Sequence, residues 1–250
     1  MLPLTPHHFT FHISSNPFVL RSSHATLRFR VKIEQMKLML LRVKVNPSVS
    51  LEIEKRLNSK PALYPTNKAA TRGFPIQPNQ NFFEVDNLFP SQIVPKDMII
   101  AFNETTAVQG RQNRCPFYFQ PFGIESIKVT VDGVVYPSPH GFERLRWTGD
   151  DVNYYMAYFS LFSYDMNINE GNLINLEEFA NCYCMFRLSL GHIQNSLQDH
   201  RNVTKVSNSR LTITFADGTT NPALTCLVWY EMDVNYAITA KRELLKDFTS

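Results

Sequence analysis

Glycine is scarce in this sequence, with 9 residues among 250, whereas proline occurs 15 times. Phosphate-binding loops depend on closely spaced glycines, because only glycine lets the backbone approach the phosphate so closely. The composition therefore argues against a Gly-rich phosphate-binding fold. Long apolar runs are also missing, since none approaches the about 20 residues that a membrane-spanning helix needs. We therefore expect no membrane partner.

The short motifs of common enzymes are missing as well. The sequence holds no G-x-S-x-G elbow, Walker loop, H-E-x-x-H, EF-hand loop or dinucleotide fingerprint. His140 and His192 lie in loop-like contexts without a Ser or Cys nucleophile beside them. Asp150 and Asp151 sit where acidic side chains stabilise the start of a helix, which explains them without catalysis. We predict a protein that is not an enzyme, with no catalytic, cofactor-binding or metal-binding residues and no small-molecule substrate.

Cysteine is rare and scattered. The four residues are Cys115, Cys182, Cys184 and Cys226. They form no C-x-x-C pair and have no His at zinc spacing, and three of them lie in apolar strand-like runs. We predict free thiols that are buried or half-buried in a reducing compartment, in preference to a disulfide or a metal site. Asn103 and Asn202 match the glycosylation acceptor pattern, which matters only in a secreted protein.

Charge divides the chain near residue 60. Residues 1–60 hold 10 Lys and Arg against 3 Asp and Glu, whereas residues 61–250 hold 15 against 19, so the two parts carry net charges of +7 and −4. Residues 1–25 show no hydrophobic period and lack the apolar core and small-residue cleavage site of a signal peptide. We predict an unstructured leader and no secretion.

Apolar and mainly basic residues alternate after the leader. The apolar positions are Leu27, Phe29, Val31 and Ile33, and the charged ones are Arg28, Arg30, Lys32 and Glu34. This period predicts a half-exposed strand, followed by a second strand-like run that ends at Val45. A short helix is predicted over 48–58, with Ser50 as its N-cap and Ile53 and Leu57 on one face. A nucleic-acid contact by the basic segment 27–45 is disfavoured, because its charges lack the repeated interleaved aromatics that single-strand binding requires, Phe29 being the one aromatic.

Short strand-like segments dominate the rest of the chain. Prolines punctuate residues 59–81, which predicts a linker followed by the entry to a strand, with a domain boundary near residue 61. The expected strands are 81–86, 92–102, 122–131, 134–137, 182–190, 209–216 and 223–236. Asp132-Gly133 predicts a two-residue hairpin turn between two of them. Such a density of short strands is typical of a sandwich or a barrel.

Two short helices are expected between the strands. The first follows a capping box that begins at Thr148. Its shared apolar face is expected to comprise Val152, Tyr155, Phe159 and Phe162. The second begins at Asn175, with Glu178 three residues later as the partner in a second capping box.

A series of motifs runs in a fixed order along residues 61–248. It comprises Tyr64-Pro65, DNLFPSQIVPKDMIIAF, NRCPFYFQPF, IKVTVDGVVYP, YYMAYFSLF, INLEEFANCYCMFRLSL, SRLTITFADG and LTCLVWYEMDVNYAI. The series resembles the C-terminal jelly roll of the double jelly-roll major capsid proteins of Polinton (Maverick) elements and adintoviruses, relatives of the adenovirus hexon. The most specific pieces are Asp86 to Phe102, Arg114 to Phe117 and the turn Val131-Asp132-Gly133.

The resemblance implies an all-β fold, an eight-stranded jelly-roll sandwich of the viral capsid type with one or two short inserted helices, over residues 61–250. Residues 41–58 also resemble the family's junction between its two jelly rolls. Residues 26–60 would then be orphan strands and a connecting helix from the end of a first jelly roll that is otherwise missing. A truncated gene copy, or an incomplete gene model of an element integrated in a host genome, follows as a hypothesis.

The function implied by the resemblance is structural. Family members form homotrimers, which give pseudo-hexagonal capsomers that tile an icosahedral shell, so the expected partners are further copies, neighbouring capsomers and minor capsid proteins. The expected location is the virion, with assembly in the nucleus or cytoplasm of a host cell. Loops 103–121 and 191–208 are long and polar, which makes them the candidates for contacts between subunits. The alternatives are a single jelly-roll module that binds a carbohydrate or peptide, and a cupin-like enzyme, whose clustered His and Glu ligands are missing.

Overall fold

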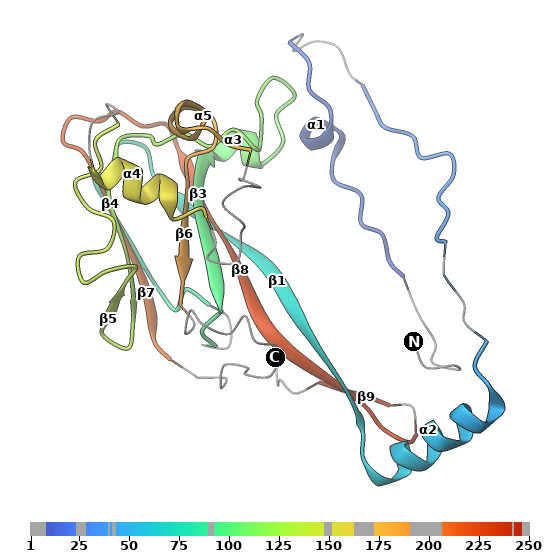
Figure 1. Cartoon of the computed structure of the whole chain (residues 1–250). Coiled ribbons are helices and arrows are strands. Elements are labelled where there is room, and N and C mark those ends of the chain that lie inside the picture. The colour runs from blue at the N-terminus through green and yellow to red at the C-terminus, as the bar shows by residue number, and fades with distance from the viewer. Residues whose placement is uncertain are drawn as a thin grey trace.

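A computed structural model shows a two-layer antiparallel β sandwich (Figure 1). It describes residues 9–23, 29–39, 41, 44–89, 93–147, 152–162, 173–190, 207–241 and 243–246. The strands of the described residues are β1 (Ala62–Ile76), β2 (Phe82–Asp86), β3 (Asp97–Glu104), β4 (Ile124–Val131), β5 (Val134–Tyr136), β6 (Met185–Ser189), β7 (Ser209–Phe215), β8 (Leu224–Ile238) and β9 (Leu244–Lys246). The helices are α1 (Asn16–Val19), α2 (Pro47–Ser59), α3 (Thr105–Val108), α4 (Val152–Phe159) and α5 (Leu176–Asn181).

The strand order is that of a jelly roll. One sheet runs β1-β8-β3-β6 and the other runs β2-β7-β4-β5, and all their pairings are antiparallel. From β1 to β8 the chain crosses between the sheets at every connection except the β4–β5 hairpin, which produces the nested Greek keys of this fold. The jelly-roll sandwich is confirmed. β9 is an addition, because it pairs with the far end of β8.

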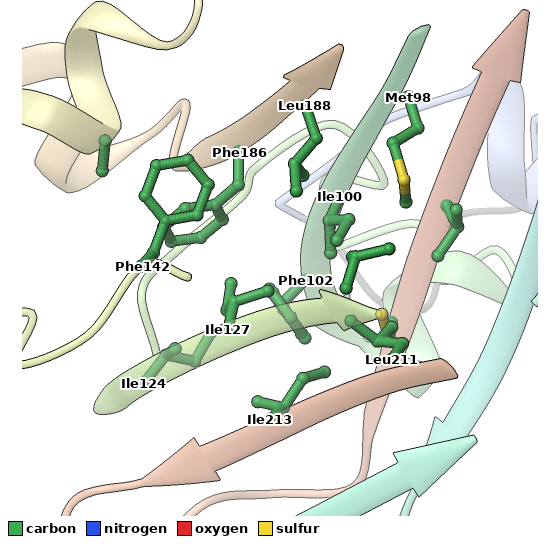
Figure 2. Close-up of a cluster of buried hydrophobic side chains, with 14 of the residues drawn as sticks. Met98, Ile100, Phe102, Ile124, Ile127, Phe142, Phe186, Leu188, Leu211 and Ile213 are labelled. Carbon is green, nitrogen blue, oxygen red and sulfur yellow. The ribbon is translucent and has the colours of Figure 1, made fainter. Parts of the chain in front are cut away.

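The core lies between the inner faces of the two sheets (Figure 2). Every second residue of a strand points inward, so each strand contributes alternate apolar side chains. Those with no more than 1% of their surface exposed include Met98, Ile100, Phe102, Ile124, Ile127, Phe186, Leu188, Leu211 and Ile213. Each such side chain contributes about 1.5–3 kcal/mol by leaving water. The helices α4 and α5 extend this core through Tyr154 and Phe179.

The linker expected at 59–81 is wrong. β1 runs without interruption through Pro65 and Pro75 and pairs with β8 along all 15 of its residues. A central strand is hydrogen-bonded to neighbours on both sides, so a proline there leaves a bond unmade because it has no amide hydrogen. At the edge of a sheet proline is tolerated. β1 is such an edge strand, because β8 is its one partner in the described sheet.

The helices agree with the sequence pattern in part. α5 has the expected capping box: the Glu178 amide donates to Asn175 Oδ1 at 2.8 Å, and the Asn175 amide donates to Glu178 Oε2 at 3.0 Å. α2 begins earlier than expected, and its N-cap is Asn46, not Ser50. The Asn46 side chain accepts from the Ser48 amide, and Pro47 occupies the first turn, where it has no amide to leave unpaired. Leu57 is buried on this helix, as expected.

The apolar face assigned to α4 points to solvent. The buried residues are Tyr154 and Ala157, whereas Val152 is 72% exposed and Phe159 59% exposed. Tyr154 can enter the core because its hydroxyl donates to the Leu176 carbonyl at 2.6 Å. A pattern of apolar residues cannot distinguish this face from its neighbour, because both are aromatic. The capping box expected at Thr148 lies outside the described residues.

The strands expected within 27–45 do not form in the described part of that segment. Residues 29–39 and 44–46 are irregular, and the apolar side chains of Phe29, Val31 and Ile33 remain exposed. A strand needs a neighbour to satisfy its backbone groups, and none pairs with these described residues. The leader is less irregular than expected, since it contains the one-turn helix α1. The origin of residues 26–60 in a first jelly roll stays a prediction.

Candidate self-association surface

The acidic, His and Cys side chains of the described residues do not form a metal-binding cluster. Among those residues, no group of three or more His, Cys, Asp and Glu side chains could hold a metal ion. His140 is exposed in the turn after β5. His192, Asp150 and Asp151 lie outside the described residues.

The thiols occupy packing positions. All four cysteines are free, and Cys184 and Cys226 are fully buried. Burial raises the pKa of the Cys184 thiol well above its usual range, and it raises the pKa of Cys226 as well. Because the thiolate is the form that attacks or binds metal, such thiols are inert in the folded protein. Cys115 and Cys182 are half-buried.

The acceptor pattern at Asn103 is not available for glycosylation in this fold. Asn103 is 3% exposed. Its Nδ2 atom donates to the Cys115 carbonyl at 3.0 Å, and its Oδ1 atom accepts from the Glu104 amide at 2.8 Å. The side chain thus ties the end of β3 to the loop that follows. Asn202 lies outside the described residues.

A polar hollow of about 530 Å³ lies at one end of the second sheet. Its lining is Asp86, Asn87, Thr130, Asp132, Gly133, Asn208, Ser209 and Arg210. Arg210 already bonds to Asp86 at 2.7 Å and lies 3.4 Å from Glu84. Pockets for small ligands are lined mainly by apolar and aromatic side chains with a few polar groups. This lining has no such side chain, so the hollow does not favour a ligand-binding module.

The two longest strands continue beyond the sandwich as a ribbon. β1 and β8 pair from Ile76–Leu224 to Ala62–Ile238, whereas β3 pairs with β8 only as far as Glu231. Past that point β9 joins the other edge of β8, and α2 lies at the tip (Figure 1). One side of this extension carries Tyr64, Tyr236, Ile238 and Leu244, and we call these four residues the ribbon face.

The ribbon face continues the apolar period of the core past the end of the sandwich. Residues directly opposite each other in a ladder share a face, which unites Tyr64 with Tyr236 and Leu244 with Ile238. β8 carries an apolar residue at every second position from Leu224 to Ile238. The inner half is buried, yet Tyr64 is 41% exposed and Leu244 56% exposed. Tyr236 and Ile238 are half-buried between them. An apolar stripe with exposed residues at its two sides can bind a protein partner.

A second exposed apolar patch lies on α4. Val152, Tyr155, Met156 and Phe159 recur at the spacing of one helix face, and their exposed fractions range from 38% to 72%. This is the face that sequence analysis assigned to the core.

The helices of the described residues include none that is both long and apolar enough to cross a membrane.

The β3–β4 loop, which was expected to make subunit contacts, is fixed at its base and exposed at its tip. Arg114 lies 3.3 Å from Glu104, in an ion pair that crosses the loop. Phe117 and Tyr118 are 61% and 41% exposed. The second expected contact loop, 191–208, lies outside the described residues except for its last two positions.

The pattern could have revealed the ribbon face, although sequence analysis did not identify it. A strand at 223–236 with seven apolar residues in alternation is about twice as long as the strands of 7 and 8 residues at 209–215 and 124–131 that would cover it. Because a strand rises about 3.4 Å per residue, the excess leaves about 25 Å of apolar stripe beyond the facing sheet.

Comparison with known proteins identifies similar folds but no family. No family model matches the sequence, and no curated protein matches it. Among solved structures, the chain is similar to a chain of the Sputnik virophage, determined by cryo-EM at 3.5 Å, with 12% identity and a TM-score of 0.44. It is also similar to the mavirus major capsid protein, with 14% identity and a TM-score of 0.38. Each match covers 76% of this chain, which spans 39% and 42% of those two chains.

Proposed function

We propose that this chain is a structural subunit of a viral-type capsid, a hexon-like major capsid protein or a truncated copy of one. It acts through self-association and not through catalysis. The observation that carries the proposal is a jelly-roll strand order joined to an exposed apolar ribbon face. Jelly rolls also serve lectins and cupins. The motif series along residues 61–248 favours the capsid class among these, and the polar hollow favours neither of the others.

The proposed assembly is a homotrimeric capsomer within an icosahedral shell, and its location is the virion. The ribbon face and the α4 face supply apolar surface for contacts between copies, and the tip of the β3–β4 loop supplies aromatic side chains. Cyclic assemblies use the same patches on every copy, so one favourable patch is repeated at each interface.

We further propose that residues 26–60 are the end of a first jelly roll. Two observations support this origin. The segment that contains Phe29, Val31 and Ile33 has the period of a strand but is exposed and irregular, as expected of a strand whose neighbours are missing. α2 then leads directly into β1 at Ala62. A longer transcript that encodes eight more strands upstream would support the proposal, and a stop-bounded 5′ end would contradict it.

The test of self-association uses a matched pair of variants on β1. Tyr64→Glu places a charge on the ribbon face, and Asn67→Glu places the same charge three residues along the strand on the opposite face. Both positions are exposed, so neither substitution buries a charge in the isolated chain. Size-exclusion chromatography with light scattering should show that Tyr64→Glu shifts the protein towards the monomer, whereas Asn67→Glu retains the wild-type mass. Equal masses for all three proteins would exclude the ribbon face as the contact.

A further inference from the structure

The leader docks on the β3–β4 loop. α1 brings Phe18 to the loop, where its ring meets Phe117 edge to face, with centroids 5.8 Å apart and planes at 75°. Four residues further on, the Ser22 amide donates to the Gln112 carbonyl at 2.9 Å. Figure 1 shows α1 beside the loop that follows α3. Segments about 90 residues apart in the sequence therefore form one local structure.

The loop is shaped to receive this segment. Gly110 has φ +89, and a Cβ built there would lie 3.0 Å from the Phe18 amide nitrogen and 3.1 Å from Phe18 Cβ. The leader backbone thus occupies space that a side chain at Gly110 would fill. Along the leader, Phe18, Leu20 and Ser22 are half-buried, while the residues between them are exposed. Phe18 at the end of α1 and Ser22 after it are the two residues that contact the loop, through the ring pair and the backbone hydrogen bond.

We propose that residues 16–22 form an exchangeable strap, and that in an assembly the strap of one copy docks on the site of a second copy. The site consists of Gly110, Gln112 and Phe117. Exchange of an identical element between copies needs no new contacts, because the donated segment repeats the ones it made in its own chain. The proposal rests on self-association, as proposed above, and names one of its contacts.

The reach of the leader supports exchange. More than 20 residues separate Ser22 from α2, and at about 3.3 Å per residue an extended chain of that length spans about 70 Å. Its contacts within its own chain include the ring pair, the backbone hydrogen bond to the loop, and a hydrogen bond that the Val31 amide donates to Asn16 Oδ1 at 3.1 Å. Opposite net charges, +7 on residues 1–60 and −4 on residues 61–250, favour contact between these two parts of the chain within or between copies, although the leader itself carries only Arg21 of this charge.

Hydrogen exchange of the full-length protein tests whether the strap docks. Phe18→Ala removes the ring, and Val19→Ala in the same helical turn removes a side chain that is 50% exposed. Losing an edge-to-face ring pair shifts the equilibrium between the docked and the released strap about two- to tenfold towards release. The amides of residues 109–118 should therefore exchange about two- to tenfold faster in Phe18→Ala. Val19→Ala should match the wild type. Unchanged exchange in Phe18→Ala would overturn the docking.

A glycine pair provides an independent check of the same contact. Gly110→Ala and Gly133→Ala both place a Cβ on a residue with positive φ, at +89 and +83, so their backbone strain is similar. At Gly133 nothing lies within 4 Å of that Cβ, whereas at Gly110 it meets Phe18. Only Gly110→Ala should release the strap and speed exchange at residues 16–22.

Mixing the two defective proteins tests exchange between copies. Phe18→Ala has a defective strap and an intact site, and Gly110→Ala has an intact strap and a blocked site. When Phe18→Ala carries a ¹⁵N label, its loop peptides can be followed in the mixture. Recovery of protection at 109–118 on mixing is expected. Faster exchange in each variant alone without recovery on mixing would restrict the strap to its own chain and overturn the proposal. A wild-type protein that stays monomeric by light scattering would instead show that the proposed self-association has failed.

Discussion

Phe186 joins the sheet core to the helical layer, and its truncation should be among the most damaging single changes. The residue is fully buried on β6. Its ring packs against Phe102 at 6.5 Å, Phe142 at 5.5 Å and Trp147 at 6.1 Å between centroids. Phe186→Ala removes the ring and leaves a cavity among these three aromatic neighbours, of which Figure 2 labels Phe102 and Phe142. Such changes cost about 3–5 kcal/mol, and the lost ring pairs place this site at the upper end.

The expected loss is large compared with the stability of a domain. Folded domains are stable by about 5–15 kcal/mol, so a loss of about 4–5 kcal/mol removes about a quarter or more of the total. For a chain of this length, 1 kcal/mol corresponds to about 2–4 °C in Tm, which gives an expected fall of about 8–20 °C.

The assay is urea unfolding followed by tryptophan fluorescence, because Trp147 lies beside the mutated residue. Phe82→Ala is the matched control, since Phe82 on β2 is 51% exposed and should cost less than about 1 kcal/mol. If Phe186→Ala and Phe82→Ala cost the same, the sandwich core would not be packed as described.

Two further predictions concern a helix cap and the buried thiols. Asn175→Ala should destabilise the protein by about 0.5–2 kcal/mol in urea unfolding, because the Glu178 amide loses its acceptor. The control Asn181→Ala, at the exposed end of the same helix, should destabilise the protein less. Equal losses of stability in the two variants would contradict the capping role. At pH 7–8 a thiol reagent should modify only Cys115 and Cys182 in the folded protein, and modification of Cys184 or Cys226 without unfolding would contradict their burial. Burial raises the pKa of Cys184 and Cys226 in the folded state, so the unfolded thiols lose their protons first as pH rises, and the stability that depends on the protonated thiols is complete below about pH 9 and is lost above it. The double variant Cys184→Ala, Cys226→Ala should show a smaller fall in the free energy of unfolding above that pH. An equal fall in the variant would contradict its assignment to the thiols.

Alternation and turn chemistry were sufficient to predict most of the strands. β2, β4, β5 and β7 lie within about two residues of their expected positions. β4 and β7 have one buried face, β2 alternates exposed and half-buried residues, and the turn Asp132-Gly133 separates β4 from β5. The capping box of α5 was predicted for a similar reason, since Asn175 and Glu178 satisfy each other locally. Local signals of this kind do not depend on distant parts of the chain.

Errors arose where tertiary context decides the outcome. Pro65 and Pro75 suggested a linker, yet an edge strand accommodates both. Residues 29–33 alternate like a strand, yet a strand forms only when a neighbour pairs with its backbone. On α4 the sequence offered two aromatic faces, and hydrogen bonds from Tyr154 and Tyr158 to the segment before α5 decided which one is buried.

The contact between the leader and the β3–β4 loop had no signal in the sequence. The Phe18 ring and Gly110 are more than 90 residues apart, and their fit appears only when the backbone of both segments is known. The ribbon face could have been predicted more readily, because both the apolar period of β8 and its greater length than the facing strands are present in the sequence.

The central claim is that this jelly-roll chain functions by associating with copies of itself. Sedimentation equilibrium of the full-length wild-type protein over a wide concentration range tests it most directly. The account predicts a mass that rises with concentration to three times the monomer mass or more. A protein that remains a strict monomer at the highest concentration would contradict it.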